Sequence, residues 1–228
     1  MLGSVTQYTL RLGVVLAFCV LATVSCGAPE EVAKPRPLPD EPQELSSGAY
    51  RTEEFEPAFT FRVGEGWTNE PPETSDALLL TRGHETGGLG FANIREVYVY
   101  KPTKDTERTV VEAPKDMVGW FMRHPHLRTS APDRVKVGGV EGARFDLAVG
   151  DLPEDHFGEC GSGCVDLFRV GEAYPVSLWV EDRARFTVLE DVEGQTMVTG
   201  FVSPSSTEFE EHAPEAQKVL DSVEWRDR

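Results

Sequence analysis

The chain has 228 residues, of which 39 are Asp or Glu and 22 are Lys or Arg, and its formal net charge is −17 at pH 7. This acidic excess argues against a nucleic-acid-binding protein, because affinity for nucleic acid comes mainly from Lys and Arg contacts to phosphate. It argues equally against a protein face that lies on anionic lipid.

The first predicted element is an apolar run at residues 12–24, which follows Arg11 and ends just before Cys26. As a helix this run would span about 20 Å, at about 1.5 Å per residue, which is short of the ~30 Å hydrocarbon layer of a bilayer. The pattern is therefore typical of a cleaved export signal at residues 1–25 rather than of a membrane-spanning helix.

The end of this leader, Val24-Ser25-Cys26-Gly27, resembles a bacterial lipobox. In that motif the cysteine takes a diacylglyceryl thioether and becomes the first residue of the mature protein. The resemblance implies a lipoprotein anchored through Cys26 to the extracytoplasmic face of a bacterial cell membrane, and two or more acyl chains give durable attachment. The alternative is an ordinary signal-peptidase site nearby, which leaves Cys26 as a free thiol.

The number of cysteines favours the lipid anchor. The chain has four cysteines, and Cys19 is removed with the leader. If Cys26 is acylated, Cys160 and Cys164 remain and can pair; otherwise an odd number of thiols enters an oxidising compartment. The sequence therefore predicts a secreted, membrane-anchored chain with a disulfide bond between Cys160 and Cys164.

Residues 26–49 are predicted to be a tether that begins at the lipidated cysteine. Prolines alternate with acidic residues, and few apolar side chains are available to form a core. The prolines are Pro29, Pro35, Pro37, Pro39 and Pro42. Because closely spaced prolines keep a chain semi-extended, we expect this segment to hold one folded domain, residues 50–228, away from the bilayer.

The domain at residues 50–228 is predicted to be α+β, with a twisted and mainly antiparallel sheet. Many of its segments alternate apolar and polar residues, the pattern of half-buried strands, and turns containing glycine or acidic residues separate several of them. The expected strands are residues 59–63, 77–81, 89–91, 94–100, 134–140, 143–149, 165–170, 176–180, 185–189 and 196–202.

Two helices are expected to flank this sheet. The central helix, at about residues 114–124, would begin at Pro114, since a proline suits the first helical position. It would end before Pro125, which disfavours helical geometry at the preceding residue. The C-terminal helix, at about residues 206–222, has an apolar stripe at helical spacing and can be capped by one of the two serines at its start.

Two segments carry a resemblance to a known fold. Residues 59–67, Phe-Thr-Phe-Arg-Val-Gly-Glu-Gly-Trp, resemble the opening of bacterial secreted proteins with the fold of the photosystem II extrinsic subunit P, which is shared with the Ran-binding nuclear-import factor family. Residues 219–225, Val-Leu-Asp-Ser-Val-Glu-Trp, resemble their terminal helix. The resemblance implies a twisted antiparallel sheet between helices and, since the best-known members are adaptors of larger assemblies, a binding role.

The predicted site residues are Cys26, for lipidation, and Cys160 and Cys164, for the disulfide bond. No catalytic site, metal site or cofactor is expected. His156 with Cys160 and Cys164 could in principle hold zinc, but a disulfide across the short glycine loop is expected outside the cell. The segment His124-Pro125-His126 is interpreted as a polar helix end, because the proline keeps the two rings off a common helical face. Three tryptophans are interpreted as core or core-edge residues, Trp67, Trp120 and Trp179.

The predicted function is that of an extracytoplasmic, membrane-anchored lipoprotein that acts as a non-enzymatic binding or adaptor module. Its partners would be the membrane, through the lipid on Cys26, and either another envelope protein or a small ligand. Two alternatives remain open, a structural lipoprotein of the envelope and an enzyme whose site is assembled from scattered residues. A concave apolar pocket would favour a small ligand, a flat apolar patch a protein partner, and convergent titratable groups an enzyme.

Overall fold

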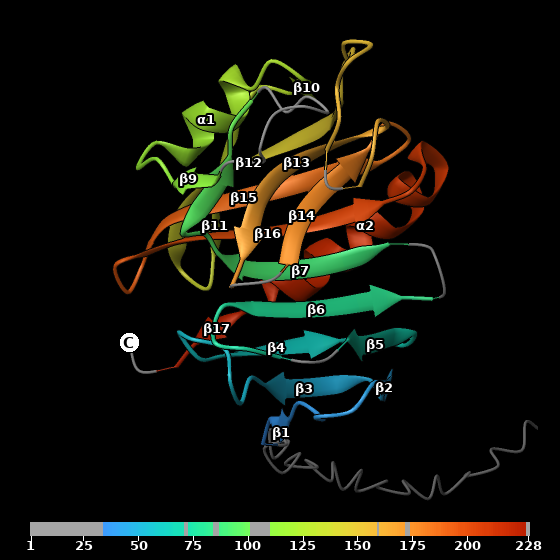
Figure 1. Cartoon of the computed structure of the whole chain (residues 1–228). Coiled ribbons are helices and arrows are strands. Elements are labelled where there is room, and N and C mark those ends of the chain that lie inside the picture. The colour runs from blue at the N-terminus through green and yellow to red at the C-terminus, as the bar shows by residue number, and fades with distance from the viewer. Residues whose placement is uncertain are drawn as a thin grey trace, which may run out of the picture. The chain divides into compact units, whose positions relative to one another are not determined.

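A computed structural model describes residues 34–70, 73–83, 87–100, 110–158, 160–171 and 174–226 (Figure 1). The described residues all belong to one compact unit, Ala33–Arg228. The predicted leader, Cys26 and the first part of the predicted tether therefore lie outside them. Within the part that is described, no helix is long and apolar enough to cross a bilayer.

The folded unit is α+β with mainly antiparallel strands, as predicted, and is built on one large sheet. The strands of this sheet are β2 (Gln43–Leu45), β5 (Trp67–Glu70), β6 (Ala77–Arg82), β7 (Gly88–Asn93), β10 (Leu127–Thr129), β11 (Asp133–Val137), β12 (Val140–Val149), β15 (Arg183–Val192) and β16 (Gln195–Ser203). Their order is β10-β12-β15-β16-β7-β6-β5-β2, and β11 pairs with β12. We call it the main sheet.

Two smaller sheets accompany it. The first has the order β1-β3-β4-β17 and consists of β1 (Arg36–Pro37), β3 (Gly48–Arg51), β4 (Phe59–Val63) and β17 (Glu224–Trp225). The second has the order β14-β13-β8-β9 and consists of β8 (Glu96–Tyr98), β9 (Val110–Glu112), β13 (Cys164–Val170) and β14 (Tyr174–Trp179). Each of these pairs is antiparallel except β1 with β3.

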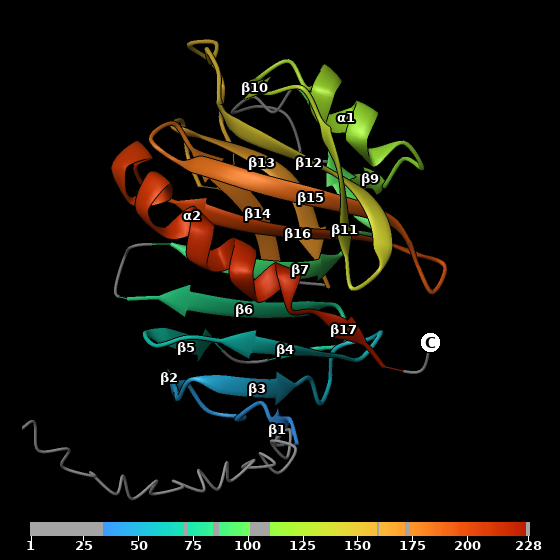
Figure 2. The ribbon, with the colours of Figure 1, turned by 180° about the vertical axis from the view of Figure 1, so that it is seen from behind.

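The two faces of the main sheet are covered by different elements. Helix α2 (Ser206–Asp221) packs on one face, and β13, β14 and helix α1 (Met117–Arg123) lie on the other (Figures 1 and 2). Strand β7 shows the alternation that separates the faces: Leu89 and Phe91 are buried in the cluster under α2, whereas Ala92 belongs to the cluster under α1. The two hydrophobic clusters therefore lie on opposite faces of the main sheet.

The helices begin and end where local chemistry places them. Helix α1 starts at Met117 rather than at Pro114, because Asp116 is the N-cap and its side chain accepts a hydrogen bond from the N–H of Gly119 (2.7 Å). It ends at His124, whose backbone is extended as Pro125 requires. Helix α2 is capped by Ser205, which accepts from the N–H of Glu208 (3.2 Å).

The segment at residues 34–49, predicted to be tether, is instead part of the folded unit. Strand β1 pairs with β3 and β2 pairs with β5. Leu38 and Leu45 are buried in the same cluster as α2, and the guanidinium of Arg36 lies 4.5 Å from the ring centre of Tyr50. The prediction was wrong here because two leucines and two short backbone pairings suffice to attach a proline-rich segment to an existing sheet. The folded domain thus begins before residue 50.

Candidate functional site

A groove with a volume of about 780 Å³ opens on the face of the main sheet that also carries β13 and β14. Its floor is formed by β6, β7 and β16, and Phe168 of β13 and Val176 of β14 contribute to one side. The lining is mainly apolar or made of small residues, so the groove is a candidate site for an apolar ligand.

Glycines explain why this face is hollow. A cross-strand row runs from Leu79 in β6 through Gly90 in β7 and Gly200 in β16 to Phe186 in β15. Two adjacent positions of the row have no side chain: the ring of Phe186 lies over Gly200, and Gly90 leaves the backbone accessible between Leu79 and that ring. Gly88 and Ala92 extend the small-residue surface along β7, because residues two apart share a face of a strand.

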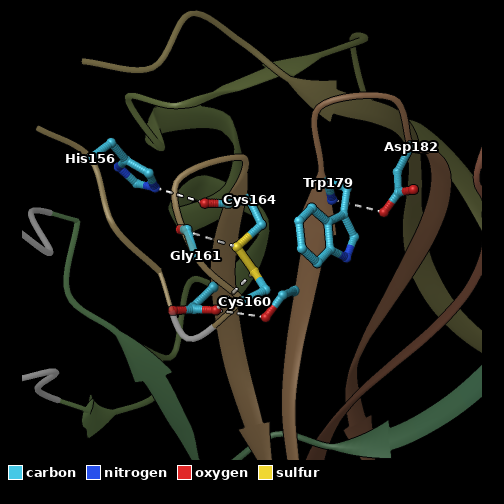
Figure 3. The surroundings of a disulfide bond; sticks show 8 residues. His156, Cys160, Gly161, Cys164, Trp179 and Asp182 are labelled. Atoms are coloured by element: carbon cyan, nitrogen blue, oxygen red, sulfur yellow. Dashed lines mark hydrogen bonds between the residues drawn. A yellow bond between two sulfur atoms is a disulfide. The ribbon is translucent and has the colours of Figure 1, made fainter. Parts of the chain in front are cut away.

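Two carboxylates, Asp182 and Glu208, are the charged groups among the residues that line the groove. The Asp182 side chain accepts a hydrogen bond from the backbone N–H of Trp179 (2.8 Å), as Figure 3 shows, and the residue is 8% exposed. Burial raises the pKa of the Asp182 carboxyl; Glu181 adds to this, while the N–H of Trp179 and the charge of Arg183 oppose it.

Glu208 lies in the first turn of α2 and is half-buried. Its Oε2 accepts a hydrogen bond from the hydroxyl of Ser205 (2.8 Å), which completes a reciprocal capping arrangement with the N–H of Glu208. Since Arg183 pairs with Ser203 across β15 and β16, Asp182 and Glu208 lie near the same end of β16. The groove therefore has an apolar floor and an acidic end.

The structure joins Cys160 and Cys164 in the predicted disulfide bond, with their Cα atoms 6.0 Å apart (Figure 3). The loop is also closed by two backbone hydrogen bonds between Gly158 and Gly161, of 2.7 and 3.1 Å. The two sulfurs and the buried carboxylate of Asp166 lie close enough together to suggest a metal site. However, both thiols are consumed by the disulfide, and the thiolate is the form that binds zinc, so this loop is structural in its oxidised state.

Three histidines, His124, His126 and His156, lie in one cluster, which the sequence did not predict. The ring of His126 lies between those of His124 and His156, with ring centres 5.9 and 4.9 Å away. His156 is buried, and its Nε2 lies 2.7 Å from the carbonyl oxygen of Cys164, so this histidine supports the disulfide loop. A separation of 30 residues along the chain gave no pattern from which this proximity could be inferred.

His124 differs most from its predicted role as a polar helix end. It is 4% exposed, with its ring centre 4.6 Å from that of Tyr100 and 5.1 Å from that of Trp120. Burial, followed by the charges of His126 and His156, lowers the pKa of His124 to about 3. Its Nδ1 accepts the backbone N–H of His126 (3.3 Å), which fits a neutral ring.

The three predicted core tryptophans divide into two kinds. Trp67 and Trp120 are buried, as expected. Trp179 is 46% exposed, because it is the last residue of β14 and lies at the turn that leads to Asp182, where the sheet does not cover its ring. The groove itself was missed, since the predicted strand at residues 89–91 left Gly88 and Ala92 outside it. The alternation of Gly88, Gly90 and Ala92 along β7 was the signal that could have revealed it.

No family model matches the chain, and no curated protein matches it. Among solved structures, the chain is similar to cyanobacterial PsbP (CyanoP) from Synechocystis sp. PCC 6803, with 12% identity and a TM-score of 0.42 over 79% of this chain and 94% of that one. It is also similar to the apo structure of the T6SS immunity protein TplEi from Pseudomonas aeruginosa, with 12% identity and a TM-score of 0.33 over 88% of this chain and 53% of that one. Neither likeness assigns a function to this chain.

Proposed function

We propose that this chain is a non-enzymatic binding module that holds a hydrophobic small molecule in the groove over β7 and β16. We propose further that a lipid on Cys26 anchors it to the extracytoplasmic face of a bacterial membrane. The observation that carries the first part is the glycine-floored groove. Its volume of about 780 Å³ lies within the range of roughly 300 to 1,000 Å³ that is usual for small-ligand pockets.

The form of the groove favours a small ligand over a protein partner. Protein partners usually meet flat apolar patches, whereas this site is concave and mainly apolar. Gly90 exposes backbone to the ligand, so a flat or flexible apolar body can approach the sheet more closely there than a side chain would allow.

The chemistry of the lining supports binding rather than catalysis. The two carboxylates that line the groove both have structural partners, the N–H of Trp179 for Asp182 and the hydroxyl of Ser205 for Glu208. A catalytic site needs titratable groups that converge on a reacting atom, and the remaining described residues of the lining carry no ionisable side chain. A binding role is therefore the simpler account of this lining.

Two features support the extracytoplasmic location. The leader and its lipobox-like end predict export and lipidation at Cys26, and the disulfide between Cys160 and Cys164 suits an oxidising compartment. In such a location the groove would meet hydrophobic molecules that are exported, imported or released from the membrane.

The test of the binding role uses the neutral, environment-sensitive dye Nile red and a variant that fills the groove. A Cβ built at Gly90 meets no atom nearer than 4.0 Å, so Gly90→Leu should fold and project its side chain into the groove. We expect saturable dye fluorescence with the wild-type protein and its loss in Gly90→Leu. The matched control is Gly64→Leu, at an exposed turn where a Cβ meets nothing within 4 Å. Equal dye binding by both variants would contradict the proposal.

A further inference from the structure

We infer that the groove takes an amphiphile with a positively charged head, an alkylammonium in chemical class, whose apolar body lies on the glycine floor and whose head lies beside Asp182 and Glu208. This inference rests on the proposed function, since it requires that the groove bind a hydrophobic molecule. It goes further by assigning the charge of the head group and the two residues that select it.

The carboxylate of Asp182 is the main reason for this assignment. The residue is more than nine-tenths buried, yet only its Oδ2 has a protein partner, the N–H of Trp179. Within the described part of the chain its Oδ1 accepts no hydrogen bond and the carboxylate forms no ion pair. An oxygen with no protein donor can accept one from a ligand, and a hydrogen bond between a cationic N–H donor and a carboxylate is about twice as strong as one between neutral groups.

The neighbouring cation does not fill this role. The guanidinium of Arg183 is directed to backbone oxygens, with Nη1 2.8 Å from the carbonyl of Asp182 and 3.5 Å from that of Glu181. Arg183 therefore stabilises the backbone of the turn between β14 and β15 and does not form an ion pair with the Asp182 side chain. Asp182 is itself one of the residues that line the groove.

Glu208 adds a second negative charge near the same end of β16. It lies in the first turn of α2, near the positive end of the helix dipole, a position favourable for a carboxylate even without a ligand. With two carboxylates and no cation among the lining residues that the structure describes, and a net charge of −17 on the whole chain, the field at the groove favours cations and repels anions. A fatty acid with an alkyl chain as long as that of the alkylammonium would bind more weakly, because the two carboxylates repel its negatively charged head.

The experiment compares three ligands that share one alkyl chain and differ in head group: decylammonium, 1-decanol and decanoate. Each is titrated against Nile red bound to the full-length protein at neutral pH. We expect decylammonium to displace the dye at a concentration about tenfold below that of 1-decanol, because a charge-assisted hydrogen bond is added. Decanoate should be the weakest competitor.

Three variants locate the selectivity. Asp182→Asn keeps an oxygen for the N–H of Trp179, and Glu208→Gln keeps the capping arrangement, so both should fold. Each should weaken decylammonium binding about tenfold and leave 1-decanol unchanged. Glu181→Gln removes the same charge from an exposed neighbour that does not line the groove, and should leave decylammonium binding within about twofold of wild type.

The outcomes separate this inference from the proposed function. Equal displacement by all three ligands overturns the head-group selectivity and leaves the hydrophobic groove intact. Unchanged decylammonium binding in Asp182→Asn overturns the assignment of Asp182. Absence of Nile red binding by the wild-type protein overturns the proposed function and this inference together.

Discussion

The ring of Phe186 lies over the backbone of Gly200, its cross-strand partner in the β15–β16 pair. A Cβ at Gly200 would collide with this ring, whereas a Cβ at Gly90, the next residue in the same row, would meet no atom nearer than 4.0 Å. The two glycines thus have different roles: Gly200 lets an aromatic side chain pack flat on the sheet, and Gly90 leaves the floor of the groove open.

The first prediction follows from this difference. Gly200→Ala should lower the free energy of unfolding by about 1 to 3 kcal/mol, because the ring of Phe186 and the carbonyl oxygen of Arg185 leave no room for a methyl group. Chemical unfolding in urea, followed by tryptophan fluorescence, measures the change.

The control for this prediction is Gly90→Ala. Its new methyl group would lie 4.0 Å from the carbonyl oxygens of Gly200 and Leu78, an ordinary contact distance. The unfolding free energy should stay within about 0.5 kcal/mol of wild type. If the two alanine variants were equally stable, the packing of Phe186 on Gly200 would not be the reason for that glycine.

The sequence was most informative where one residue type determines a local geometry. Alternating apolar residues predicted most strands, Pro125 predicted the end of α1, and a serine cap was predicted for α2 and is provided by Ser205. These are short-range effects, in which the backbone responds to its own neighbours.

The groove and the histidine cluster could not be predicted in the same way, because they depend on register between distant strands. Gly90 and Gly200 are 110 residues apart and become neighbours only when β7 pairs with β16. The segment at residues 34–49 shows the same limit, since Leu38 and Leu45 are buried against residues far along the chain. From its composition alone, that segment was predicted to be a tether.

The second prediction concerns acid. His124 is neutral in the folded protein, with a pKa of about 3, while its pKa in the unfolded chain is close to the ordinary value of 6.5. Below pH 6.5 the unfolded state therefore binds a proton that the folded state does not, so the unfolding free energy falls as the pH is lowered from about 6.5 to about 3. This one group should cost roughly 3 kcal/mol between pH 7 and pH 4.

The measurement is the unfolding free energy across this pH range in wild type and in His124→Gln. The variant should lose most of the decline between pH 6.5 and pH 4, whatever its stability at neutral pH. His212→Gln, on α2, serves as the control and should keep the wild-type decline. A wild-type decline in His124→Gln would show that other groups cause the acid sensitivity.

The third prediction concerns the disulfide bond between Cys160 and Cys164. The non-reduced protein should yield a peptide in which these two cysteines are linked, detected by mass spectrometry. Because the bond closes a short loop, replacing both cysteines by alanine should cost about 2 kcal/mol at most in the chain-entropy model. The fold should survive, since Gly158 and Gly161 still exchange two backbone hydrogen bonds. Two free thiols and bound zinc in the purified protein would contradict the disulfide assignment.

The fourth prediction tests the anchor. If Cys26 carries the lipid, Cys26→Ser should move the protein from the membrane fraction of the producing bacterium to the soluble fraction, because the acyl chains supply the free energy of attachment. Cys160→Ser is the matched control, since it removes a thiol of the folded domain and should leave the protein in the membrane fraction. Electrostatic attraction to the membrane is not an alternative anchor, because the net charge of −17 disfavours contact between the protein and anionic lipid. Retention of Cys26→Ser in the membrane would instead indicate that another segment or a partner protein holds the chain there.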